Sequence, residues 1–213
     1  RIVENLSITT GLPMPKVYVI DDPSPNAFAT GRDPQHAAVA ATTGLIDMMT
    51  DRELEGVMAH EMAHVGNYDI KVSMIAFGLV AAISVLCDIG LRIAIRGADS
   101  SDDDRANAIL LAVALVAAIF GPMIAMMVQM AVSRNREYLA DATAALTTRD
   151  PESLASALTK LSENKTTLRN QNPSMANMYI NNPLKKGWLA KMTSTHPPIE
   201  ERIARLQQMA GQF

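Results

Sequence analysis

The pentapeptide His60-Glu61-Met62-Ala63-His64 decides how the rest of this sequence is interpreted. Residues four apart share one face of a helix, so the two histidines can bind a single zinc ion while the glutamate reaches its bound water. That arrangement is the core of a zinc metallopeptidase. A chance match is rare in a chain with only four histidines among 213 residues, and the alternative is a helix with two surface histidines.

The residues that precede the pentapeptide predict the helix that the motif needs. Residues 50–53 (Thr-Asp-Arg-Glu) form a capping box, and Leu54, Val57 and Met58 follow at helical spacing. We therefore expect one helix from this box through His64.

Further upstream, three short segments predict a small sheet. Lys16–Ile20 and His36–Thr43 have the character of short strands, and Asn26–Thr30 is a third candidate between Pro25 and Gly31. We expect these segments to form a small antiparallel sheet on one side of the active-site helix.

The composition is unusual for a domain surrounded only by water. Apolar residues make up 48% of the chain, aromatic residues only 4%, and fourteen residues are methionine. The net charge of −3 and the lack of basic runs interleaved with aromatic residues argue against nucleic-acid binding. The lone Cys87 excludes an internal disulfide and fits a reducing compartment. Because the chain opens with Arg1 and has no signal-peptide pattern, we expect it to be processed or part of a longer protein.

Two apolar runs predict a transmembrane helical hairpin. Ala106–Val132 contains no charged residue and exceeds the roughly 20 residues that a helix needs to cross a bilayer. Gly121-Pro122 within it should bend the helix without breaking it. The first run, Val72–Ile95, is interrupted by Asp88 and Arg92, which are spaced to pair. The alternative is a long buried core hairpin.

The hairpin divides the chain into three parts. Residues 1–71 would form the first part of the catalytic domain, residues 72–132 the hairpin with an acidic loop at 96–105, and residues 133–213 the second part. A two-span hairpin returns the chain to its starting side. Four Lys and Arg residues flank the spans on that side against three on the loop side, which favours a catalytic domain facing the cytoplasm.

The second part of the catalytic domain is predicted to be helical. We expect helices over Arg134–Leu146, Pro151–Glu163 and Ile199–Met209. Residues 164–187, rich in Asn, Lys and Pro, predict a loop or flap with a short helix near 175–180.

A catalytic zinc usually takes a third protein ligand, and Glu137 is the strongest candidate. Asp141 follows at i+4 on the same helix face, so one carboxylate could bind the metal and the other could orient a ligand. The hairpin would bring this helix beside the helix of the pentapeptide, just outside the membrane. A solvated acidic face is the alternative, and His36, in a predicted turn, is a weaker candidate ligand.

Four ordered motifs also carry a family resemblance. They are Asn26–Gly31, the pentapeptide, Ser133–Asp141, and Thr195–Pro198 with Arg202 after it. Over essentially its whole length the chain resembles the HtpX-type membrane zinc metallopeptidases of prokaryotes, distant relatives of the CAAX prenyl proteases. The resemblance implies Glu137 as the third ligand of one zinc ion per chain and a hydrogen bond from a ligand histidine to Asp141. It also implies two further spans ahead of the catalytic segment.

The resemblance further implies how substrate is bound. Asn26, Ala27 and Phe28 would form the strand edge along which a peptide lies as an added strand, a mode that tolerates varied sequences. His196 would lie near the metal, where a donor could stabilise the oxyanion. Its other interpretation is a capping histidine before the helix that starts at Pro197-Pro198.

The expected fold is α+β, mainly helical and gluzincin-like, with a small antiparallel sheet and an inserted transmembrane hairpin. The expected function is zinc-dependent endoproteolysis of misfolded or damaged membrane proteins in stress-linked quality control, in a multi-pass protein of the bacterial inner membrane. Zinc would lower the pKa of its water toward ~7, and Glu61 would take the proton and deliver it to the leaving amine.

Two other functions fit parts of the sequence. One is a narrow-specificity processing protease of the CAAX type, although two spans cannot build the large intramembrane chamber of those enzymes. The other is a non-catalytic, zinc-stabilised membrane scaffold, against which the presence of Glu61 argues.

Overall fold

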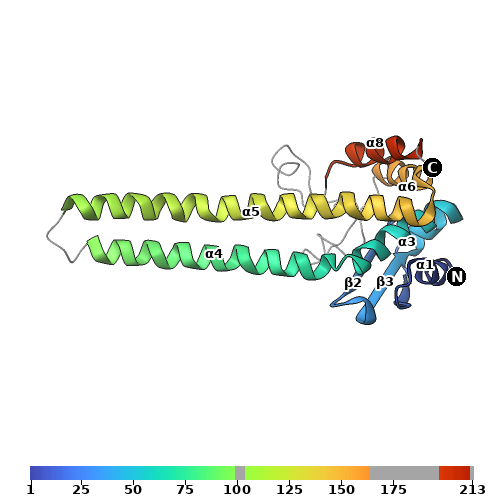
Figure 1. Ribbon diagram of the computed structural model, residues 1–213, viewed down its shortest axis with the longest axis horizontal. Helices are drawn as coiled ribbons and strands as arrows, with labels where there is room; N and C mark the ends of the chain where they lie inside the picture. The colour runs from blue at the N-terminus through green and yellow to red at the C-terminus, as the bar shows by residue number, and fades with distance from the viewer. Residues whose placement is uncertain (99–103, 164–196, 212–213) are drawn as a thin grey trace. The chain divides into compact units, whose positions relative to one another are not determined.

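The computed structural model describes residues 1–98, 104–163 and 197–211. The chain divides into two compact units, of which the first combines Arg1–Lys71 with Ser133–Phe213 and the second is Val72–Val132. Most described residues are helical, and one small sheet lies in the first unit (Figure 1). The expected α+β, mainly helical fold with a small sheet and two apolar helices is confirmed.

The first unit contains the sheet and most of the short helices. In chain order, its elements are α1 (Ile2–Thr10), β1 (Lys16–Ile20), β2 (Ala27–Gly31), the 3₁₀ turn η1 (Pro34–His36), β3 (Ala37–Thr42), α2 (Thr43–Met48), α3 (Asp51–Gly66), α6 (Pro151–Glu163) and α8 (Ile199–Ala210). The two long helices α4 (Asp69–Ala98) and α5 (Asp104–Thr148) begin and end in this unit, respectively. The three predicted strands and the pentapeptide helix are thus present, with small shifts at their ends.

The sheet is mixed, so the expectation of an antiparallel sheet is wrong for one strand pair. The strand order is β1-β3-β2, with β2 antiparallel to β3 and β1 parallel to β3. Short connections reverse the chain after each strand, so the first and third strands run in the same direction. Because β3 lies between β1 and β2, it is also the neighbour of β1. These two strands, β1 and β3, run in the same direction and therefore pair in parallel.

Helix α3 begins at the predicted capping box. The Thr50 hydroxyl accepts from the Glu53 backbone N–H at 3.3 Å, and the Glu53 carboxylate accepts from the Thr50 N–H at 2.8 Å. The helix ends where Tyr68 adopts a φ of 57°, and α4 starts at the next residue. Both ends of the helix that carries the pentapeptide are therefore defined by local interactions.

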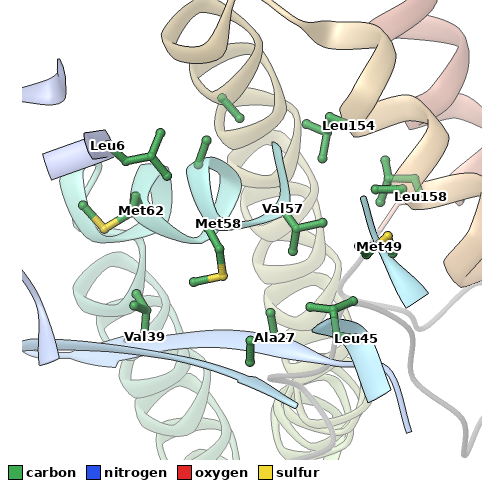
Figure 2. Packing of buried hydrophobic residues seen from close by; sticks show 14 of the residues in the cluster. Leu6, Ala27, Val39, Leu45, Met49, Val57, Met58, Met62, Leu154 and Leu158 are labelled. Carbon is green, nitrogen blue, oxygen red and sulfur yellow. The ribbon is translucent and has the colours of Figure 1, made fainter. Parts of the chain in front are cut away.

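The core of the first unit fixes α3 between the sheet and α6. Val57, Met58 and Met62 of α3 are buried, and Figure 2 shows them between Val39 of the sheet and Leu154 of α6. Met62, inside the pentapeptide, is only 1% exposed. Since the core holds this side of α3, the two histidines of the same helix have little freedom to move.

A glycine allows α3 and α6 to approach closely. A Cβ added at Gly56 would meet the backbone and side chain of Leu154 at about 3.2 Å, which is tighter than most real contacts. The two helices therefore contact through backbone at this point, and the residue on the α3 side must remain small.

The second unit consists of the apolar parts of α4 and α5, which Figure 1 draws as two long helices. Both are long and apolar enough to cross a membrane, with a mean hydropathy of 2.3 for Asp69–Gly97 and 2.6 for Asn107–Thr148. In the most apolar 18-residue stretch of the first helix no residue is buried, and in that of the second helix 6% are. That exposure argues against a buried core hairpin, in which most of these side chains would be covered.

Within the second unit, α5 is not broken at its proline and the expected Asp88–Arg92 pair is present. Helix α5 continues through Pro122. Asp88 Oδ2 accepts from Arg92 Nε at 2.7 Å, as their i, i+4 spacing predicts. A Cβ at Gly121 would lie 2.7 Å from Cys87 Sγ, so the glycine allows the two helices to pack closely here. Residues 99–103 of the predicted acidic loop lie outside the described residues.

Candidate metal centre and active site

Two helices of the first unit supply three side chains that could hold a metal ion. His60 and His64 lie one turn apart on α3, and Glu137 lies on α5. The Nε2 atoms of the two histidines are 3.1 Å apart. The Glu137 carboxylate is 3.7 Å from His60 Nε2 through Oε2 and 3.5 Å from His64 Nε2 through Oε1. The candidate ligand atoms therefore cluster around one point.

These separations fit the coordination sphere of zinc. Tetrahedral zinc with bonds of about 2.0–2.1 Å holds neighbouring ligand atoms about 3.4 Å apart. The three measured separations, 3.1, 3.5 and 3.7 Å, lie on either side of that value. Three protein ligands leave one tetrahedral position for water or substrate, as in catalytic zinc sites.

The charge around these ligands also favours a divalent cation. The side chains that surround the site include four buried acidic residues and two arginines: Glu61, Asp69, Glu137, Asp141, Arg136 and Arg202. Four carboxylates against two guanidinium groups leave two negative charges. A divalent ion offsets that charge, which would otherwise be costly to bury.

His60 is held by a buried carboxylate that is itself paired with an arginine. Asp141 Oδ1 lies 3.0 Å from His60 Nδ1, so it can accept the ring N–H there and leave Nε2 for the metal. Arg202 of α8 donates to both Asp141 oxygens at 2.7 Å and lies 3.1 Å from Glu137 Oε2. Burial alone would raise the pKa of Asp141, but the Arg202 charge and the His60 hydrogen bond lower it to about 2.

His64 has an equivalent carboxylate partner. Asp69 Oδ2 lies 2.6 Å from His64 Nδ1, and the Asp69 carboxylate also pairs with Arg136. Burial disfavours the charged His64 ring, but the hydrogen bond to Asp69 and the charges of Glu137 and Glu61 raise its pKa to about 9. The potential that holds a proton on this ring without metal is the same potential that attracts a metal cation.

Glu61 lies beside the metal ligands and is not one of the three. It is 4% exposed and follows His60 directly on α3. Its carboxylate is close enough to act electrostatically on both His64 and Arg202. A carboxylate beside a metal site, on the same helix as two ligands, is where a general base for a metal-activated water is found.

The predicted substrate-binding residues lie at an edge of the sheet. Ala27 and Phe28 are in β2, and Asn26 precedes that strand, with its backbone N–H and carbonyl both bonded to Thr42. β2 is a terminal strand of the β1-β3-β2 order, so one of its sides has no strand partner among the residues that the structure describes. Such an edge can accept an added peptide strand.

Of two further predicted candidates, one lies outside the cluster and the other outside the described residues. His36 is exposed and its side chain contacts Asp33 and Arg32 in the turn before β3. His196 lies outside the described residues, as do the predicted loop at 164–187 and its short helix. The weaker alternative for the third ligand, His36, is thus placed away from the other two.

Three residues of the site had no role assigned from the sequence. Arg202 follows one of the four motifs that carry the family resemblance, which indicated that it matters. Its ion pairs were not evident from the sequence. Asp69 reaches His64 only because the chain turns at Tyr68 between α3 and α4. Arg136 meets Asp69 across 67 positions of the sequence, and no local pattern indicates such a contact.

The fold and the site together define a membrane metallopeptidase. A model of peptidase family M48 matches residues 1–210, and the chain belongs to that family. The HtpX-type resemblance is confirmed by similar proteins. A protease HtpX homolog of Tropheryma whipplei (strain TW08/27) is 59% identical over 211 residues, covering 99% of this chain and 72% of the relative. One of Ligilactobacillus salivarius (strain UCC118) is 51% identical over 213 residues, with 98% and 72% covered.

A solved structure supports the fold. The chain is similar to S. mikatae Ste24p in its crystal structure, with a TM-score of 0.60 and 23% sequence identity. The match covers 96% of this chain and 48% of the Ste24p chain, so this chain spans about half the length of that protein. At this level of identity the similarity establishes a shared fold.

Proposed function

We propose that this chain is a zinc-dependent endopeptidase that cleaves misfolded or damaged membrane proteins in stress-linked quality control. One observation carries the proposal: His60 Nε2, His64 Nε2 and the Glu137 carboxylate lie within 3.1–3.7 Å of one another, at the spacing of a zinc coordination sphere. A zinc ion held by these three residues supplies Lewis-acid activation of water and of the scissile carbonyl.

The residues around the ligands supply the remaining chemistry. Glu61 accepts the proton of the attacking water and delivers it to the leaving nitrogen. Asp141 fixes the His60 ring through Nδ1, so that Nε2 remains available to the metal. A peptide that pairs with Asn26, Ala27 and Phe28 is held in extended form, which positions one carbonyl for attack. His196 is proposed as a donor to the oxyanion.

The substrate class follows from the binding mode and the apolar helices. Main-chain pairing at a strand edge selects for an unfolded or extended segment and tolerates varied side chains. The two exposed apolar helices suit a protein of the bilayer, and we place it in the bacterial inner membrane with the catalytic unit on the cytoplasmic side. Together these features favour broad cleavage of unfolded membrane proteins.

Replacing Glu61 separates metal binding from catalysis. We expect Glu61→Gln to retain about one zinc per chain and to lose several orders of magnitude in casein cleavage, because the amide cannot accept the proton. Metal analysis and casein cleavage by the protein in detergent check both expectations. The control is Glu55→Gln, the same change elsewhere on α3.

Three results would overturn the proposal. Casein cleavage by Glu61→Gln at the wild-type rate would show that Glu61 is not the general base. Absence of zinc from the wild-type protein after loading would show that the site does not bind zinc. Cleavage of prenylated peptides with no cleavage of casein would replace broad quality control with narrow-specificity processing.

A further inference from the structure

The metal site has two carboxylate–arginine pairs, one behind each histidine. Behind His60, the pair is formed by Asp141 and Arg202, which belong to the site described above. Behind His64, the pair is formed by Asp69 and Arg136. The two pairs come from different elements, but in each of them a carboxylate lies within hydrogen-bond distance of the Nδ1 atom of a histidine.

Asp69 determines which nitrogen of His64 can bind metal. Its Oδ2 lies 2.6 Å from His64 Nδ1, a short hydrogen bond that places the ring proton on Nδ1 when the ring is neutral. His64 Nε2 then carries the free lone pair and faces the Nε2 of His60 at 3.1 Å. The bond also limits rotation of the ring, because Asp69 is itself 5% exposed and fixed at the first turn of α4.

Arg136 joins the two helices that supply the metal ligands. Its guanidinium pairs with Asp69 and donates to the backbone carbonyl of Asn67, the residue that caps the C-terminus of α3. Arg136 directly precedes Glu137 on α5. One side chain therefore connects the end of α3, near His64, to the turn of α5 that presents the third ligand.

Both contacts of Arg136 are made through one nitrogen, Nη2. The two N–H groups of Nη2 lie in the guanidinium plane and point in fixed directions, whereas an ammonium group is a compact charge whose donors rotate. The Arg136 side chain is 23% exposed and the Asp69 side chain 7%. A positive charge alone would be enough to neutralise Asp69. The second contact, to the carbonyl of Asn67, indicates that Arg136 also holds the end of α3 in place.

We infer that Asp69 and Arg136 form a positioning pair that holds His64 and the Glu137 segment of α5 in register for metal binding. This inference rests on the proposed zinc site and assigns a purpose to two residues outside the ligand set. The pair would act on the affinity for the ion and on the orientation of its ligand side chains. It does not touch the substrate.

The test measures metal binding directly. We expect Asp69→Asn to weaken zinc binding by roughly 10- to 100-fold, the usual effect of losing a carboxylate behind a ligand histidine. Zinc affinity is measured on the protein in detergent by competition with a chromophoric chelator. The d–d absorption of the cobalt-loaded protein is recorded as well, because a change in ligand orientation alters that spectrum and a general loss of stability does not.

Companion variants separate positioning from charge. Asp69→Glu keeps the negative charge but displaces the carboxylate, and Arg136→Lys keeps the positive charge but not the fixed donor directions of Nη2. Both should lie between wild type and Asp69→Asn in zinc affinity. The double variant Asp69→Asn/Arg136→Gln should lose little more than Asp69→Asn alone, since residues that act as a unit are not additive. Asp51→Asn, an exposed member of an ion pair in the same unit, is the matched control.

The outcomes are distinguishable from a failure of the proposed function. If wild type does not bind zinc, the zinc site itself is wrong. If wild type binds zinc and Asp69→Asn or Asp69→Glu binds it within about twofold with an unchanged cobalt spectrum, only the positioning pair is wrong. Should Asp69→Asn not fold, Asp69→Glu and Arg136→Lys decide by the same two measurements, and wild-type values in both would overturn the inference.

Discussion

At the scale of single residues, Arg202 explains how several carboxylates can be buried together. The side chain is fully enclosed and contacts both Asp141 and Glu137. Burial disfavours its charge, but the nearby carboxylates of Asp141, Glu137 and Glu61 raise the pKa of Arg202 further above its ordinary range. It therefore remains charged at any working pH and favours the ionised form of Asp141, which is the form that the carboxylate supporting His60 requires.

The ligand and its supporting residue should differ in their effect on zinc. We expect Glu137→Gln to weaken zinc binding far more than Asp141→Ala, because the first change replaces an anionic ligand atom and the second only releases the His60 ring. For Asp141→Ala we expect a loss of roughly 10- to 100-fold. Zinc titration with a competing chelator measures both. An unchanged affinity in Glu137→Gln would show that the third ligand lies elsewhere, with His196 the next candidate.

The sequence could predict the ligands better than their partners. The HEMAH spacing placed His60 and His64 on one helix face, and the return of the hairpin placed Glu137 near them, since both arguments use local periodicity and topology. The contacts of Arg202 join α8 to α3 and α5 over more than sixty sequence positions. Such contacts depend on how helices pack in three dimensions, which no single stretch of sequence specifies.

At the scale of elements, α3 is tied to α6 at its N-terminal end through Glu53. This carboxylate belongs to the capping box, and it also accepts from Lys160 Nζ at 2.6 Å and from Ser156 Oγ at 2.7 Å. Burial alone would raise the pKa of Glu53, but these hydrogen bonds, with those from Thr50, lower it from 4.5 to about 2. One residue thus caps the active-site helix and fixes the neighbouring one.

Removing this charge should destabilise the protein in a pH-dependent way. We expect Glu53→Gln to lower the free energy of unfolding by roughly 1–3 kcal/mol at neutral pH. Because the folded pKa is depressed, the contribution of wild-type Glu53 is complete above about 4.5 and is lost as the pH falls toward about 2. The difference between wild type and variant should shrink over that range.

Urea unfolding of both proteins, followed by circular dichroism at neutral and acidic pH, measures this difference. Glu55→Gln on the same helix is the control and should change the stability little. A difference between wild type and Glu53→Gln that stayed constant down to pH 2 would contradict the assignment of the depressed pKa to this carboxylate.

The elements themselves were largely predictable, and the exception has a physical cause. Helices and strands follow from local periodicity and caps, so Lys16–Ile20 is a strand and Thr50 caps a helix, as expected. The pairing of β1 with β3 depends on which strand occupies the centre of the sheet. That choice is made by the burial of Val39 and its neighbours against α3, which is a property of the packed unit.

At the scale of the whole molecule, one helix serves both the hairpin and the metal site. Helix α5 runs without interruption from Asp104 to Thr148, and it includes the apolar run, the Arg136 contact and Glu137. Its 45 residues span about 67 Å at 1.5 Å per residue, more than twice the roughly 30 Å hydrocarbon thickness of a bilayer. The helix is therefore long enough to cross a membrane and to continue beyond it, so that a candidate metal ligand and an apolar span belong to the same helix.

This length leads to a prediction of topology that needs no substrate. In a Cys87→Ala background, a cysteine at Ala98, the end of α4, should be labelled by an impermeant maleimide from outside intact cells. A cysteine at Thr148, the end of α5, should be labelled only after lysis, because the hairpin returns the chain to its starting side and the excess of Lys and Arg favours that side for the cytoplasm. Labelling of both cysteines after lysis shows that each is accessible. If both were labelled from the same face of intact cells, at least one of the two apolar helices would not cross the membrane.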